Sequence, residues 1–181
     1  QQLKDKGHIF KSDSDNEVIL HAYKEWGVKC LDNLLGMFAF IIWDDEKKEL
    51  FAARDHAGIK PLYALPMPNG IALSSECSPL VMLAPEKKLN RLALSYFLTL
   101  GYVPAPLSIW DKIIKIEAGQ ALFWSEAKGL RLFRYWSPPA YIDDMSRHNE
   151  WDDLFQTVTA QHLQADVPVG LYLSAGLDSS S

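Results

Sequence analysis

Residues 37–54 read MFAFIIWDDEKKELFAAR, two apolar runs on either side of the polar turn at residues 44–48. Short apolar runs separated by such a turn predict a β-hairpin. The first run, residues 37–43, is apolar at every position, which predicts a strand covered on both faces, as in a layered sandwich. A sheet buried between other layers is therefore expected in the first part of the chain.

Helix and turn signals extend this pattern in both directions. Ser14 and Glu17 have the spacing of a capping box, and apolar residues then recur at helical spacing, which predicts a helix from about Asp15 to Trp26. Similar reasoning predicts a hairpin of residues 62–65 and 71–74, a helix over 92–100, and a hairpin of residues 121–124 and 130–135. The first part of the chain thus reads as a mixture of helices and antiparallel hairpins.

Composition restricts the function. The chain has 181 residues, is 48% hydrophobic and carries a formal charge of −5, so a folded chain is expected, with neither a nucleic-acid nor a membrane-surface partner. The longest uncharged run, residues 92–110, is broken by glycine and prolines, and no transmembrane helix is expected. Cys30 and Cys77 are too few for a disulfide scaffold, which favours a reduced, cytoplasmic location. The chain starts without Met and stops after an apolar run, so both ends are expected to be cut.

The composition changes after Trp136. Residues 137–139 read Ser-Pro-Pro and a polar segment follows, which predicts a first domain over 1–136, a linker over 137–150 and a second domain over 151–181. In the second domain, residues 151–162 have an apolar helical face, residues 169–173 read as a short buried strand, and small residues follow. This order is typical of the opening of a doubly wound α/β domain.

The small-residue turn has phosphate-binding chemistry. Backbone N–H groups after a buried strand can form a concave nest for an anion, and Ser174 and Ser179 add hydroxyl donors. Asp178 would repel phosphate unless a cation is shared, which suggests Mg²⁺. Walker and dinucleotide fingerprints are absent. An ordinary Gly/Ser turn that caps a helix remains the alternative.

Two sets of motifs resemble one family. Residues 166–180, DVPVGLYLSAGLDSS, resemble the pyrophosphate-binding loop of the glutamine-hydrolysing asparagine synthetases. Residues 10–20, 36–40 and 54–63 resemble the glutaminase domain of the same enzymes, and shorter likenesses follow at residues 74–76 and 101–106. The motifs occur in the family's order over nearly the whole chain.

The resemblance implies an enzyme with two active sites. One is an incomplete glutaminase domain of the αββα N-terminal-nucleophile type, an α+β layered fold, which releases ammonia from glutamine. The other is the start of an ATP-pyrophosphatase domain, which activates aspartate with ATP and Mg²⁺ as a β-aspartyl adenylate. The implied partners are the small molecules glutamine, aspartate and ATP, and homodimerisation of the parent stays open.

The resemblance carries over to few residues. It implies that Asp15 binds the α-amino group of glutamine; alternatively, Asp15 only favours the start of a helix. It places ATP and pyrophosphate at Leu173, Ser174, Ala175, Gly176, Leu177, Asp178 and Ser179, with Asp178 also the metal ligand. Ala175 replaces the family's usual glycine, and nucleotide binding is still expected. No catalytic residue is expected here, because the family's nucleophile is the first residue of the mature chain, which excludes Cys30 and Cys77.

Three further features are expected to be structural. Arg54 and Asp55 are predicted to form a strand-end ion pair that fixes the corner at residues 58–61. Ser74 or Ser75 with Glu76 is predicted to cap a helix, and His162 to be a hydrogen-bonded core residue. Two functional alternatives also stay open. The first is a related amidotransferase or β-lactam-forming ligase with another acceptor, and the second is a non-catalytic scaffold or interaction domain.

Overall fold

The computed structural model describes residues 1–140, 150–165, 167–170 and 172–177. The chain forms two compact units, residues 1–138 and 139–181, and each is considered by itself. The helical elements of the first unit are α1 (Gln2–Asp5), α2 (Asp15–Trp26), the 3₁₀ helix η1 (Gly27–Asn33), α3 (Cys77–Leu83) and α4 (Arg91–Leu100). Its strands are β1 (Ala39–Asp44), β2 (Glu49–Arg54), β3 (Tyr63–Met67), β4 (Gly70–Ser74), β5 (Ile114–Lys115), β6 (Gln120–Ser125) and β7 (Gly129–Arg134).

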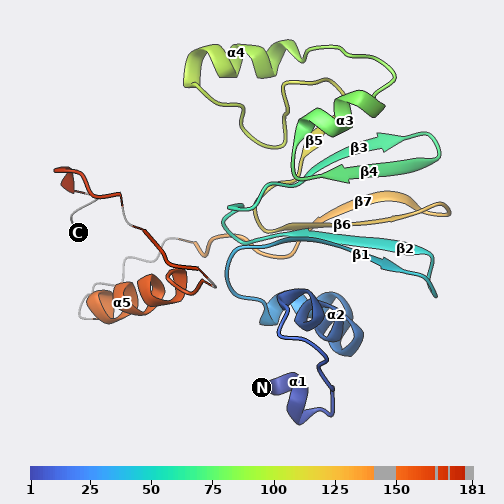
Figure 1. Cartoon of the computed structure of the whole chain (residues 1–181). Helices are drawn as coiled ribbons and strands as arrows, with labels where there is room; N and C mark the ends of the chain where they lie inside the picture. The colour runs from blue at the N-terminus through green and yellow to red at the C-terminus, as the bar shows by residue number, and fades with distance from the viewer. Residues whose placement is uncertain (141–149, 166, 171, 178–181) are drawn as a thin grey trace. The chain divides into compact units, whose positions relative to one another are not determined.

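The strands of the first unit form two antiparallel sheets. One has the order β1-β2-β6-β7 and the other the order β4-β3-β5. The first sheet packs one face against α2 and η1, where Ala22, Leu31 and Phe51 are buried together, and the other face against the second sheet through Ala52 and Leu122. The second sheet is covered in turn by α3 (Figure 1). The layers therefore run helix, sheet, sheet, helix, which confirms the expected α+β layered fold.

Most of the predicted elements are confirmed. Strands β1 and β2 pair from Ala39↔Arg54 to Asp44↔Glu49, and the other two hairpins are β3–β4 and β6–β7. Helix α2 has the predicted bounds, and α4 ends at Gly101, which adopts a left-handed φ of 79°. Helix α3 follows the cap that had been predicted at residues 74–76, whereas α1, η1 and the short strand β5 had not been predicted.

The prediction that the first strand is covered on both faces is wrong for the described chain. Phe40 and Ile42 are buried, whereas Ile41 and Trp43 on the opposite face are 48% and 50% exposed. Strand β1 lies at the edge of its sheet, and the core between the sheets contains side chains of β2, β6 and β7 but none of β1. The three-stranded second sheet is too narrow to cover this edge.

The second unit differs from its prediction in two respects. Helix α5 (Trp151–His162) forms as expected, but the described part of residues 169–173 is not a strand, and Tyr172 is fully exposed. A parallel strand needs neighbouring strands for its hydrogen bonds, and the described residues of this unit form none. His162 is hydrogen-bonded, with Nδ1 2.8 Å from the carbonyl oxygen of Val158, yet it is exposed and not a core residue.

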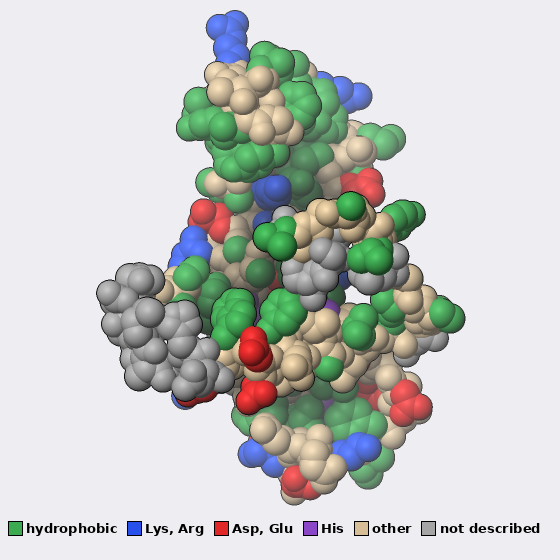
Figure 2. Space-filling model, turned by 90° about the vertical axis from the view of Figure 1, so that its left-hand side faces the viewer, with side chains coloured by type: hydrophobic (Ala, Val, Ile, Leu, Met, Phe, Trp, Pro, Cys, Tyr) green, Lys and Arg blue, Asp and Glu red, His purple; other side chains and the backbone are tan. Residues whose placement is uncertain are grey.

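Apolar side chains also gather on the outer surface over α4, at the top of the view in Figure 2, where Leu92, Phe97 and Leu98 are at least half exposed.

Among the described residues, no helix combines the length and the apolar character needed to cross a lipid bilayer.

Candidate functional site

The start of α2 presents the residue expected to bind glutamine. Ser14 is the N-cap, and its hydroxyl accepts a hydrogen bond of 3.3 Å from the backbone N–H of Asn16. Asp15 is the first residue of the helix and is exposed. Its carboxylate lies at the positive end of the helix dipole, where a negative charge is favoured. An exposed carboxylate in this position is accessible to a cationic group of a ligand.

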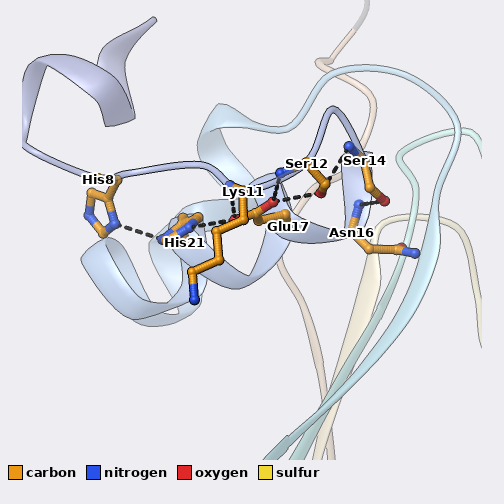
Figure 3. A network of polar contacts seen from close by, with 7 residues as sticks. All are labelled: His8, Lys11, Ser12, Ser14, Asn16, Glu17 and His21. Carbon is orange, nitrogen blue, oxygen red and sulfur yellow. Dashed lines mark hydrogen bonds and ion pairs between the residues drawn. The ribbon is translucent and has the colours of Figure 1, made fainter.

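The loop before α2 is held by Glu17, which does not complete the predicted capping box. Its carboxylate accepts the backbone N–H groups of Lys11 and Ser12, each at 2.8 Å, and the Ser12 hydroxyl at 2.6 Å (Figure 3). The Glu17 side chain thus hydrogen-bonds to residues 11 and 12 and not to the N-cap residue, Ser14. The Ser12 hydroxyl, followed by the Lys11 amide, lowers the pKa of Glu17 from its ordinary 4.5 to about 2.

A chain of polar contacts continues from Glu17. His21 Nε2 lies 3.5 Å from Glu17, His21 Nδ1 lies 2.9 Å from His8 Nδ1, and His8 Nε2 lies 3.0 Å from Glu25. Glu25 also pairs with Lys6 at 2.7 Å. Hydrogen bonds from Lys6 and then His8 lower the pKa of Glu25. This network had not been predicted, although the spacing of four between Glu17, His21 and Glu25 on one helix was a signal for it.

The corner after β2 is fixed by Arg54 and Asp55, but not by the ion pair that had been predicted. The Arg54 guanidinium donates to the carbonyl oxygens of Gly58, Lys60 (2.7 Å) and Ile116. Both residues are buried, and Asp55 is only 1% exposed. The Asp55 carboxylate accepts the N–H groups of Ile59 and Lys60, each at 2.9 Å. Each side chain binds backbone groups, because buried backbone donors and acceptors need partners.

The predicted helix cap at residues 74–76 also differs in detail. The N-cap of α3 is Glu76, whose side chain makes no capping hydrogen bond. Instead, the Ser74 hydroxyl accepts the backbone N–H of Glu76 at 3.1 Å. Ser74 therefore stabilises the turn into α3 and not the first turn of the helix.

The two cysteines are structural in character. Both are free; Cys30 is buried and Cys77 is partly buried. Burial raises the pKa of Cys30 to about 11 and that of Cys77 above its ordinary value. Since the thiolate is the reactive form, neither residue is suited to a nucleophilic role at neutral pH.

The predicted phosphate loop lies in the second unit and is described in part. The Ser174 hydroxyl accepts the backbone N–H of Gly176 at 3.2 Å, and Leu173, Ala175 and Leu177 are exposed. Asp178 and Ser179 lie outside the described residues. The described part is therefore an exposed segment with a turn closed by the Ser174 hydroxyl.

Comparison with known proteins places the chain in a class. The family model described as "Glutamine amidotransferase domain" matches residues 1–136, and the model described as "Asparagine synthase" matches residues 150–181. The chain therefore belongs to the glutamine amidotransferase domain family, with the asparagine synthase family matching its last part. The fold agrees: glutamine phosphoribosylpyrophosphate amidotransferase from B. subtilis is similar over 76% of this chain and 26% of its own, with a TM-score of 0.50 at 23% identity.

Proteins similar in sequence to this chain include several named as asparagine synthetases. Asparagine synthetase [glutamine-hydrolyzing] 3 of Bacillus subtilis is 36% identical over 100% of this chain and 30% of its own length. A putative glutamine-hydrolyzing asparagine synthetase of Methanocaldococcus jannaschii is 34% identical over 99% of this chain and 36% of its own. "Amidase chry2" of Gibberella zeae is 30% identical over 95% of this chain and 26% of its own. The chain thus spans about a third of the length of these relatives.

Proposed function

We propose that the protein carrying this chain is a glutamine-dependent asparagine synthetase that releases ammonia from glutamine and uses ATP to convert aspartate into asparagine. The observation that carries the proposal is that matches to a glutamine amidotransferase domain and to asparagine synthase follow one another on one chain. We assign residues 1–136 to the later part of the glutaminase domain, 137–150 to a linker and 151–181 to the start of the ATP-binding domain.

At the glutamine site, the contribution of this chain is recognition of the substrate. The exposed Asp15 carboxylate binds the α-amino group of glutamine, because a carboxylate accepts charge-assisted hydrogen bonds from an ammonium group. The sheet β1-β2-β6-β7 holds this helix in place through Ala22, which is buried in the same core as Phe51. The nucleophile is supplied by the first residue of the mature protein.

At the synthetase site, the loop of residues 173–179 binds ATP and the pyrophosphate that leaves. The backbone of Leu173 meets the nucleotide, and residues 174–177 surround the phosphates. The composition of this segment supports the assignment, since hydroxyl and backbone N–H groups are the usual partners of phosphate oxygens. Asp178, with Ser179 beside it, would hold Mg²⁺, which neutralises phosphate charge during adenylation.

A second candidate function keeps the ATP chemistry and changes the acceptor. In this reading a carboxylate other than aspartate is amidated, and the similarity to a protein that is not named for asparagine synthesis, "Amidase chry2", supports it. In either case the remaining partners are small molecules, not nucleic acid or membranes. The free cysteines support a cytoplasmic location.

The test uses the complete protein with ATP, Mg²⁺ and a panel of carboxylates, with glutamine or ammonia as the nitrogen source. The proposal expects AMP, pyrophosphate and asparagine to form with aspartate from either nitrogen source. Activity with another carboxylate alone would support the second candidate. No AMP with any acceptor, together with no release of ammonia from glutamine, would leave only an interaction domain.

A further inference from the structure

The polar network before and along α2 contains a second acidic residue, Glu17, close to Asp15. Glu17 lies two residues further along, and its side chain, only 18% exposed, is directed at the backbone of the preceding loop (Figure 3). We propose that Glu17 is a positioning residue for glutamine: it fixes the loop that leads into α2 and thereby the position of Asp15. This inference rests on the proposed function of Asp15.

The loop of residues 11–14 depends on Glu17 because packing does not hold it. All four of its residues are exposed. Glu17 Oε1 accepts the Lys11 N–H, and Glu17 Oε2 accepts both the N–H and the hydroxyl of Ser12. The Ser12 hydroxyl oxygen in turn accepts the N–H of Ser14 at 3.3 Å. The constraint therefore passes from Glu17 through Ser12 to Ser14, which directly precedes Asp15.

The other side of Glu17 is braced by the two histidines. An ionised carboxylate only accepts hydrogen bonds, so Glu17 and Glu25 are best served when the facing Nε2 atoms of His21 and His8 both carry hydrogen. The two Nδ1 atoms face each other at 2.9 Å and need one hydrogen between them. The two rings thus link Glu17 to Glu25 on the side of α2 that faces His8.

These contacts also define what Glu17 does not do. Both carboxylate oxygens are already used by protein donors, from the loop on one side and from His21 on the other. Binding a substrate ammonium group directly would require breaking these contacts. Asp15 is exposed and can bind the ammonium group of glutamine directly. Glu17 therefore affects glutamine binding by fixing the loop and does not contact the substrate.

The experiment measures glutamine-dependent and ammonia-dependent synthesis by the complete protein for wild type, Glu17→Gln, Ser12→Ala and Glu49→Gln. The substituted side chain in Glu17→Gln keeps the shape of the glutamate side chain. One of its two acceptor oxygens is replaced by an amide NH₂ group, which cannot accept a hydrogen bond from the backbone N–H groups of the loop. We expect the glutamine KM of Glu17→Gln to rise about tenfold, the effect of weakening one good contact to a charged ligand. The kcat and the ammonia-dependent rate should stay near wild type.

Two variants grade the result. Ser12→Ala removes only the hydroxyl contact. Its glutamine KM should rise about threefold, because one of the hydrogen bonds between Glu17 and the loop is lost and the backbone hydrogen bonds remain. Glu49→Gln is the matched control, because Glu49 pairs with Arg131 at 3.4 Å on strands outside this loop, and its kinetics should equal wild type. Hydrogen exchange of residues 11–14 should be faster in Glu17→Gln than in the control.

An unchanged glutamine KM in Glu17→Gln overturns the inference, and so does an equal fall of glutamine-dependent and ammonia-dependent rates, which would mean a general structural defect. A raised KM without faster exchange of residues 11–14 also overturns it, because it would indicate direct contact. If the wild type makes product with ammonia but not with glutamine, the proposed glutamine-dependent function is wrong. This outcome is seen with the wild type alone, so it is distinguished from a failure of the inference on Glu17.

Discussion

Asp55→Ala tests how the corner after β2 is held. The carboxylate is 1% exposed and accepts the N–H groups of Ile59 and Lys60 at 2.9 Å each. Hydrogen bonds to a charged group contribute about 1.5–3 kcal/mol each. Ile59 is half exposed, so water can replace part of what is lost, and we expect a loss near the lower end of the sum, about 3 kcal/mol.

The assay is thermal unfolding of the complete protein, followed by hydrogen exchange of residues 54–61. A loss of about 3 kcal/mol lowers the midpoint of a unit of this size by about 6–12 °C. Asp55→Asn keeps one acceptor and should lose about half as much. Asp45→Ala is the control, because the Asp45 side chain is 80% exposed in the β1–β2 turn. A midpoint that falls no further in Asp55→Ala than in this control would refute the reasoning.

Three further predictions concern other parts of the first unit. Phe51→Ala should lower the free energy of unfolding by about 3–5 kcal/mol, because Phe51 is fully buried and stacks on Tyr23 at 5.2 Å; a loss below about 1 kcal/mol in urea unfolding would argue against this core. Gly119→Ala should lower the thermal midpoint and alter tryptophan fluorescence, since a Cβ would clash with the Trp136 carbonyl oxygen and φ is +65°; unchanged values would contradict this clash. The pKa of Glu17 is lowered to about 2, so its stabilisation of the loop is complete above its ordinary pKa of 4.5 and is lost as the pH falls from there toward 2; an NMR titration midpoint at 4.5 would contradict the hydrogen bonds drawn to it.

Local patterns predicted the elements of the fold well. The apolar runs and the turn of residues 37–54, the N-cap at Ser14 and the stop at Gly101 are short-range signals, and each element formed near its predicted bounds. The exposed face of β1 could not be predicted in this way, since it depends on the width of the opposing sheet. Hydrophobicity alone does not report that width.

The candidate site was predictable only where its chemistry is carried by neighbouring residues. Asp15 and residues 173–179 come from motifs, and their roles remain predictions. The partners of Arg54 include the carbonyl oxygen of Ile116, which lies 62 residues away, and backbone acceptors leave no trace in a sequence. The His8–His21 contact joins a loop to a helix, so only its helical half, Glu17, His21 and Glu25, had a visible spacing.

The central claim is that this chain recognises glutamine through Asp15. The most direct measurement is glutamate release from glutamine by the complete protein, comparing wild type with Asp15→Asn and with Asp45→Asn as control. We predict that Asp15→Asn raises the glutamine KM by about tenfold or more, as expected for loss of a charge-assisted contact, while ammonia-dependent synthesis is unchanged. Equal KM values for wild type and Asp15→Asn, or no glutamate release by the wild type, would contradict the claim.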